Sequence, residues 1–185
     1  MGDFVHLHTH SEYSLLDGLG KLDHLIARAK SYDMDSLALT DHGSMYGTFK
    51  FYLKAKAAGI KPILGVETYV ARRSRFDKEA KVDTDPFHLL LLAKNATGYR
   101  NLMKLVTHAH LEGYYYKPRI DWELLKEHHE GITYLVLSSI QVQDRDGSGR
   151  ESFTECGHSR GEQNGRSMNV NVRLVIVEFD SVSCD

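Results

Sequence analysis

The chain has 185 residues, of which 42% are hydrophobic and 26% charged, as in a globular protein of one ordinary domain. A formal net charge of −2 excludes the overall basic surface that binds nucleic acid or membranes non-specifically. No apolar run is long enough to span a bilayer, and the first residues lack a secretion signal. Two cysteines without paired spacing are typical of a reducing compartment, so we expect a cytoplasmic protein without membrane association.

Hydrophobic periodicity predicts alternating strands and helices along residues 4–138. The expected strands are short apolar segments at 4–9, 35–40, 60–71, 88–94 and 132–138. One expected helix starts at Lys21, and three more cover residues 45–58, 98–112 and 121–129. Thr97 and Asp121 are the predicted N-caps of the last two helices. Continuous apolar strands between amphipathic helices favour a parallel α/β sheet or barrel, in which ligands bind at the carboxyl ends of the strands.

The C-terminal part has a different character. Residues 143–167 contain five glycines and four serines but no Leu, Ile, Val, Met or Ala, so they cannot build a packed core. Apolar and polar side chains alternate along residues 168–179 well enough to predict a strand, although no later strand is expected to pair with it. Residues 72–86 are charged and are expected to form a solvated loop.

Three histidines, His6, His8 and His10, occupy every second position near the N-terminus. An extended backbone places alternate side chains on one face, so the three imidazoles would share it. Asp17 follows on a turn before Gly18. Imidazole suits zinc, iron and manganese, and this pattern favours a metal site over a surface strand with incidental histidines.

Further imidazoles and carboxylates lie in or beside the later strands. The complete candidate ligand set is His8, His10, Asp17, His42, Glu67 and His88. This mixture suits two or three divalent cations bridged by oxygens, as in metal-assisted phosphoester hydrolysis. Asp41 is expected to orient His42 without binding metal itself.

Five ordered motifs resemble a known family. They are HLHTHSEYSLLDG, LTDHGSMYG, GIKPILGVETYVA, HLLLLAKNATGYRNL and GYYYKPRID. They are similar to the N-terminal PHP (polymerase and histidinol phosphatase) domain of bacterial DNA polymerase III alpha subunits, over residues 4–138. The resemblance implies an α/β fold that is an incomplete PHP-type (β/α)7 barrel with parallel strands. It also implies a trinuclear site of zinc, manganese or iron with nine ligands, six of which correspond to the set above.

The resemblance leaves His6 either supporting the ligands or on the surface. Asp17 and His42 would take part in catalysis only through the metal. The family's seventh ligand is a cysteine, but residues 138–140 read Ser-Ser-Ile, and the late Asp-x-His motif is absent. Three absent ligands would leave the divalent metal cluster incomplete.

These departures predict a partial PHP domain at 1–139 and a non-family tail at 140–185 that is disordered or frame-shifted, with a natural, divergent tail as the alternative. Cys156 and His158 of this tail could replace two ligands in principle, but we do not expect them to do so.

The resemblance implies a fragment of a DNA-directed DNA polymerase, a nucleotidyltransferase of DNA replication, with DNA and other polymerase subunits as partners. The chain lacks the polymerising domains, so the chemistry left to it is metal-dependent 3′–5′ exonuclease or phosphoesterase activity. The alternatives are a standalone phosphoesterase of the histidinol-phosphatase type and a non-catalytic structural module. Two basic segments could contact nucleic acid or serve only the fold: Tyr114–Arg119, and the cluster Arg72, Arg73, Arg75 and Lys78.

Overall fold

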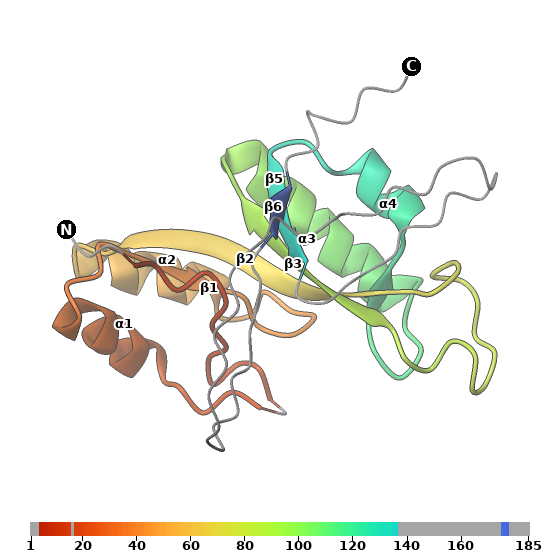
Figure 1. Ribbon diagram of the computed structural model, residues 1–185, viewed down its shortest axis with the longest axis horizontal. Coiled ribbons are helices and arrows are strands. Elements are labelled where there is room, and N and C mark those ends of the chain that lie inside the picture. The colour runs from red at the N-terminus through yellow and green to blue at the C-terminus, as the bar shows by residue number, and fades with distance from the viewer. Residues whose placement is uncertain (1–3, 16, 137–174, 178–185) are drawn as a thin grey trace, which may run out of the picture.

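The computed structural model describes residues 4–15, 17–136 and 175–177, which form one mixed sheet with flanking helices (Figure 1). The helices are α1 (Leu22–Ser31), α2 (Thr48–Ala57), α3 (Ala96–Leu111) and α4 (Trp122–Glu127). The strands are β1 (Ser36–Leu39), β2 (Lys61–Val70), β3 (Phe87–Ala93), β4 (Arg119–Ile120), β5 (Ile132–Val136) and β6 (Val175–Val177).

The long strand β2 joins the two halves of the sheet. Its first four residues pair in parallel with β1, and residues 65–70 pair antiparallel with β3. Its last two residues also pair in parallel with β4. Figure 1 shows α1 and α2 beside the β1 half and α3 and α4 beside the β3 half. The predicted α/β class with parallel strands is confirmed, but three described pairs, β2–β3, β3–β5 and β5–β6, are antiparallel.

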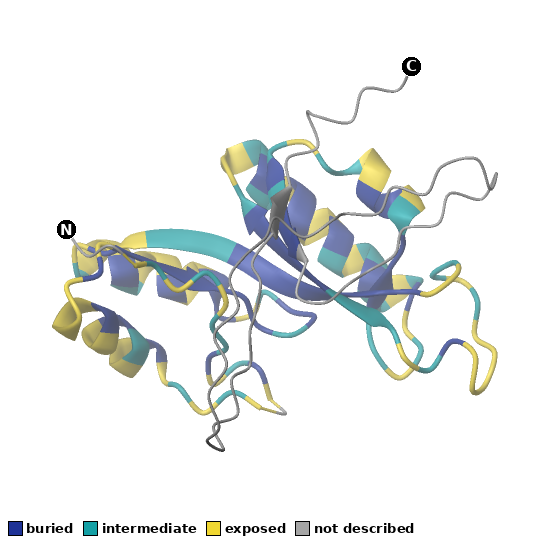
Figure 2. Ribbon diagram, viewed as in Figure 1, coloured by how far each residue is buried: buried dark blue, intermediate teal, exposed yellow. Residues whose placement is uncertain are grey.

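Three hydrophobic clusters surround the described sheet. One joins α1, β1 and α2 through Leu22, Leu39 and Phe51, and another packs α3 and α4 against β2 and β3. The third joins β1, β3 and β5 through Ala38, Leu90 and Leu135. Figure 2 shows the buried residues concentrated in the sheet, with exposed residues on α1. The apolar run Leu89–Leu92 is buried at every position because both faces of β3 are covered.

Residues 4–10 are not the regular strand that the alternating pattern predicts. They run beside β1, where the carbonyls of His6 and Thr9 accept from the amides of Ala38 and Thr40. In the opposite direction, the amide of Thr9 donates to the Thr40 side-chain hydroxyl at 3.0 Å and not to a backbone carbonyl. A side chain therefore replaces one backbone partner, and the ladder is interrupted at this point.

The N-cap of α3 is Asn95 and not Thr97 as predicted. The Asn95 side chain accepts from the amide of Gly98 at 2.9 Å. Two candidate caps lie two residues apart here, and the fold selects the earlier one, so α3 begins at Ala96. The other predicted cap is confirmed, since Asp121 accepts from the amide of Leu124 at 3.0 Å.

The segment 72–86 is held by charged groups, although it contains neither helix nor strand. Arg73 pairs with the buried carboxylate of Asp83 at 2.6 Å, and Arg75 pairs with Asp121 at 2.9 Å. The guanidinium of Arg119 is buried and donates to the carbonyls of Gly113, Asp83, Arg75 and Asp77. This segment is therefore anchored to the fold and is not simply a solvated loop.

Within the predicted strand at 168–179, the structure describes only β6, at residues 175–177. It pairs antiparallel with the earlier strand β5. The other expectations for the tail, including Cys156 and His158, lie outside the described residues, and the boundary at residue 139 stays a prediction.

Replacing Asn95 with alanine is expected to lower the free energy of unfolding by about 1 kcal/mol, because the amide of Gly98 loses its partner. The same change at Thr97 should cost less than about 0.5 kcal/mol. Thermal unfolding followed by circular dichroism would measure both variants. A larger loss at Thr97 would contradict the assigned cap.

Candidate metal centre

The six predicted ligands come from distant parts of the chain and converge. His8 and His10 belong to the extended segment beside β1, Asp17 to the turn after it, and His42 to the loop after β1. Glu67 lies in β2 and His88 at the start of β3. They form three overlapping groups, each with ligand atoms within 4.8 Å of one another: His8, His10 and Glu67; His10, Asp17 and His42; His42, Glu67 and His88.

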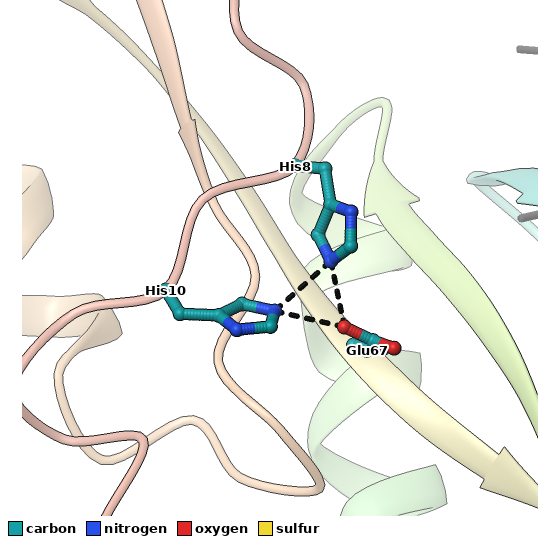
Figure 3. A group of neighbouring side chains, drawn as sticks. All are labelled: His8, His10 and Glu67. Atoms are coloured by element: carbon teal, nitrogen blue, oxygen red, sulfur yellow. Dashed lines mark hydrogen bonds and ion pairs between the residues drawn. The ribbon is translucent and has the colours of Figure 1, made fainter. Parts of the chain in front are cut away.

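Glu67 lies at the centre of this cluster and belongs to two of its three groups. Its side chain is only 3% exposed, and its Oε2 lies 2.6 Å from Nε2 of His8 and 2.8 Å from Nε2 of His10. The other oxygen, Oε1, contacts Nδ1 of His88. Figure 3 shows the rings of His8 and His10 pointing from one extended segment toward this carboxylate on β2. Nδ1 of His42 lies 3.5 Å from Oε2, so four imidazoles surround the Glu67 carboxylate.

His10 and His42 each lie between two carboxylates. The two ring nitrogens of His10 are 3.1 Å from Asp17 and 2.8 Å from Glu67. Those of His42 are 2.7 Å from Asp17 and 3.5 Å from Glu67. A neutral imidazole carries one proton, whereas ionised carboxylates only accept. Each ring therefore needs either a second proton or a cation to satisfy both carboxylates.

The electrostatics keep the central carboxylate ionised. Burial alone would raise the pKa of Glu67, but hydrogen bonds from His10, His8 and His88 outweigh it and hold that pKa far below its usual range. The hydrogen bond to Glu67 raises the pKa of His10. Burial lowers the pKa of His42, which keeps its ring neutral and able to bind a metal.

His88 fits this site because β3 reverses direction. The rule that ligands gather at the carboxyl ends of parallel strands does not account for a residue at the start of a strand. In the antiparallel β2–β3 pair, His88 is the register partner of Tyr69, two residues beyond Glu67. The beginning of β3 therefore lies beside the end of β2.

Asp41 does not orient His42 as expected, and His6 follows the surface alternative. The carboxylate of Asp41 is buried, and both of its oxygens accept from Ser11, from the amide at 2.6 Å and from the hydroxyl at 2.9 Å. Asp41 thus anchors the segment that carries His10 and does not hydrogen-bond to His42. His6 is exposed, and its ring packs edge-on against Phe4, which places it on the surface.

Two further residues complete the surroundings of the ligands, and sequence reasoning did not single them out. The Ser14 hydroxyl donates to Asp17 at 2.8 Å and accepts from the amide of His42 at 3.2 Å. The Tyr69 ring stacks on the His42 ring, with 5.8 Å between the ring centres. It meets the His88 ring edge-on, with 5.0 Å between the centres. Ser14 lies inside the first motif, but only its contacts show what it does.

The donor set fits a divalent metal. Imidazole nitrogens and carboxylate oxygens suit zinc, manganese and iron. The buried Nδ1 of His42 lies 3.5 Å from Glu67 but makes no hydrogen bond to any described residue, as expected for a nitrogen that would bind a metal. Nε2 of His8 and Nε2 of His10 lie 2.9 Å apart and face the same Glu67 oxygen, an arrangement that a cation between them would satisfy.

This chain belongs to the PHP family, whose domain matches residues 6–156. It is 52% identical over 130 residues to the DNA polymerase III subunit alpha of Borreliella burgdorferi, covering 70% of this chain and 11% of that protein. The same subunit of Aquifex aeolicus is 50% identical over 140 residues, covering 72% and 12%. That of Treponema pallidum is 55% identical over 137 residues, covering 74% and 12%. The chain therefore spans about one eighth or less of the length of these three relatives.

Solved structures give weaker similarity. An amidohydrolase from Chromobacterium violaceum matches 57% of this chain and 32% of its own, with a TM-score of 0.43 and 26% identity. A protein described as a metal-dependent phosphoesterase from Bifidobacterium adolescentis matches 58% and 33%, with a TM-score of 0.42 and 17% identity. Scores this low carry no conclusion about fold or chemistry. Among the described residues, none of the helices combines the length and apolar character needed to cross a bilayer.

Replacing Glu67 with glutamine is expected to weaken Mn²⁺ or Zn²⁺ binding by at least about tenfold, because the negative charge at the centre of the ligand cluster is lost. Isothermal titration calorimetry would measure the affinity. Glu12→Gln is the matched control, since Glu12 is exposed on the same N-terminal segment. Equal affinities for the two variants would contradict the assignment of Glu67.

Metal should also stabilise the fold. Mn²⁺ at about 100 times its dissociation constant is expected to raise the free energy of unfolding by about 2.7 kcal/mol. Thermal unfolding with Mn²⁺ and with EDTA would measure this difference. Glu67→Gln should show a much smaller difference, and a metal effect of equal size in that variant would indicate binding elsewhere.

Proposed function

We propose that this chain is a metal-dependent phosphoesterase module that hydrolyses the 3′-terminal phosphodiester of DNA, as a 3′–5′ exonuclease. The observation that carries the proposal is the buried Glu67 carboxylate shared by the imidazoles of His8, His10 and His88. We propose further that it works as part of a replicative DNA polymerase alpha subunit, with DNA and other polymerase subunits as partners. Identities of 50–55% to proteins named DNA polymerase III subunit alpha support this second step.

The residues of the chain supply binding and positioning. The six candidate ligands would hold a divalent metal cluster of zinc, manganese or iron, which when bound polarises a phosphoryl oxygen and lowers the pKa of water. Glu67 and Asp17 contribute the negative charge that holds cations in place. Ser14 fixes Asp17 relative to the loop of His42, and Asp41 fixes Ser11 next to His10.

We favour DNA over a small phosphomonoester as the substrate, because the relatives that match this chain are named as DNA polymerase subunits. A standalone phosphatase of the histidinol-phosphatase type would act on a free phosphomonoester and leave DNA intact. A purely structural module would keep its fold without binding metal. The two alternatives therefore give different results in the assay below.

Asp17→Asn is expected to reduce metal-dependent nucleotide release from single-stranded DNA about 100-fold, because Asp17 lies between His10 and His42 in the ligand set. Release of mononucleotides from a 3′-labelled oligonucleotide with Mn²⁺ would measure it. Asp33→Asn is the control, since Asp33 is exposed and asparagine tolerates its positive φ of 55°.

Equal nucleotide release by wild type and Asp17→Asn would contradict the exonuclease proposal. Turnover of histidinol phosphate without action on DNA would instead support the phosphatase. A folded chain that binds no metal would support the structural module.

A further inference from the structure

The turn at residues 113–118 lies directly beside the candidate metal centre. Pro118 packs against Gly43, the residue after His42, where an added Cβ would lie only 2.8 Å from the proline ring and 3.2 Å from Tyr69. The ring of His110 is also 2.9 Å from the carbonyl of Gly43. The turn and the loop that carries His42 therefore pack against each other.

Lys117 is the charged residue that this turn brings to the edge of the site. Its ammonium lies 5.0 Å from the centre of the Tyr69 ring, and that ring contacts the ligands His42 and His88. The lysine is half-buried, and no carboxylate of the described residues lies within ion-pair distance of it. Its charge is therefore not neutralised by the part of the fold that the structure describes.

The neighbouring arginines differ from Lys117 in this respect. Arg73 and Arg75 are paired with carboxylates. The buried guanidinium of Arg119 is engaged by four backbone carbonyls. These three cations build the fold, so they are poor candidates for binding a substrate.

The backbone around Lys117 is held in place. Tyr116 adopts a positive φ of 57°, which is costly for a bulky residue and persists only where surrounding contacts enforce it. The amide of Tyr115 donates to the carbonyl of Lys117 at 3.0 Å, and the ring of Tyr115 lies 5.3 Å from the Arg119 guanidinium. A strained turn that presents a cation beside a metal-ligand cluster suits recognition of an anion.

We propose that Lys117 binds a backbone phosphate of a polynucleotide next to the phosphodiester at the metal ligands. This inference rests on the proposed function of the site. The ammonium contacts Tyr69 and not the ligand atoms, so it lies at the edge of the donor cluster. A small phosphoester has no second phosphate to reach Lys117, whereas an oligonucleotide has one. Lys117 is thus a positioning residue that selects polyanionic substrates.

The test compares Lys117→Ala with wild type by fluorescence anisotropy. The probe is a 5′-fluorescein oligothymidylate whose 3′ linkages are hydrolysis-resistant phosphorothioates, with Mn²⁺ present. Loss of one phosphate contact should weaken binding about fivefold at about 0.1 M salt. It should also make the slope of log affinity against log salt shallower by about 0.7. Thermal unfolding of each variant would show that the fold is retained.

Two variants make the comparison specific. Lys117→Arg retains the charge and should bind the probe as wild type does. Lys126→Ala removes an exposed lysine from α4 and should change the affinity little. No measurable binding by wild type, or equal weakening in Lys117→Ala and Lys126→Ala, would overturn the proposal.

Hydrolysis assays separate this inference from the proposed function. With bis(p-nitrophenyl) phosphate, which has no second phosphate, Lys117→Ala should turn over like wild type. With an oligonucleotide, KM should rise about fivefold and kcat should stay unchanged, and a fall in kcat on both substrates would overturn a positioning role. Absence of any hydrolysis by wild type would refute the proposed function, while the anisotropy result would still decide the role of Lys117.

Discussion

A buried carboxylate surrounded by imidazoles is the constraint on which this structure depends. Glu67 lies in the middle of the longest strand, almost without solvent contact. An ionised carboxylate in such a place is costly unless charged or polar partners compensate for its lost hydration. The partners are His8, His10 and His88, so the N-terminal segment and the start of β3 must both be positioned around this one side chain.

The rest of the fold supplies that positioning through contacts outside the ligand set. Asp41 holds Ser11, and Ser14 joins Asp17 to the loop of His42. On the other side, the buried Arg119 ties together the segment 72–86 and the turn that carries Lys117. Ligands on loops keep a defined geometry only when neighbouring groups fix them, and here polar contacts of short range do so.

Patterns local in sequence were sufficient to predict most elements and to select six residues that the fold brings together, whose role as metal ligands stays a prediction. The 3.6-residue period predicts α1 and α3, the apolar runs predict β1 and β3, and the alternating histidines with Asp17 predict the N-terminal wall of the site. Long-range choices could not be predicted in this way. Nothing local decides between Asn95 and Thr97 as a cap, directs Asp41 to Ser11, or reveals that β3 runs antiparallel to β2 and so delivers His88.

The separation of the ligands along the chain has a consequence for biosynthesis. His8 meets Glu67 across 59 positions, and Glu67 meets His88 across a further 21. Closing such loops costs conformational entropy that must be met by sheet formation before the site exists. A growing chain cannot assemble all six ligands until His88 has left the ribosome and β3 has docked. The complete six-ligand site therefore exists only after this region has folded.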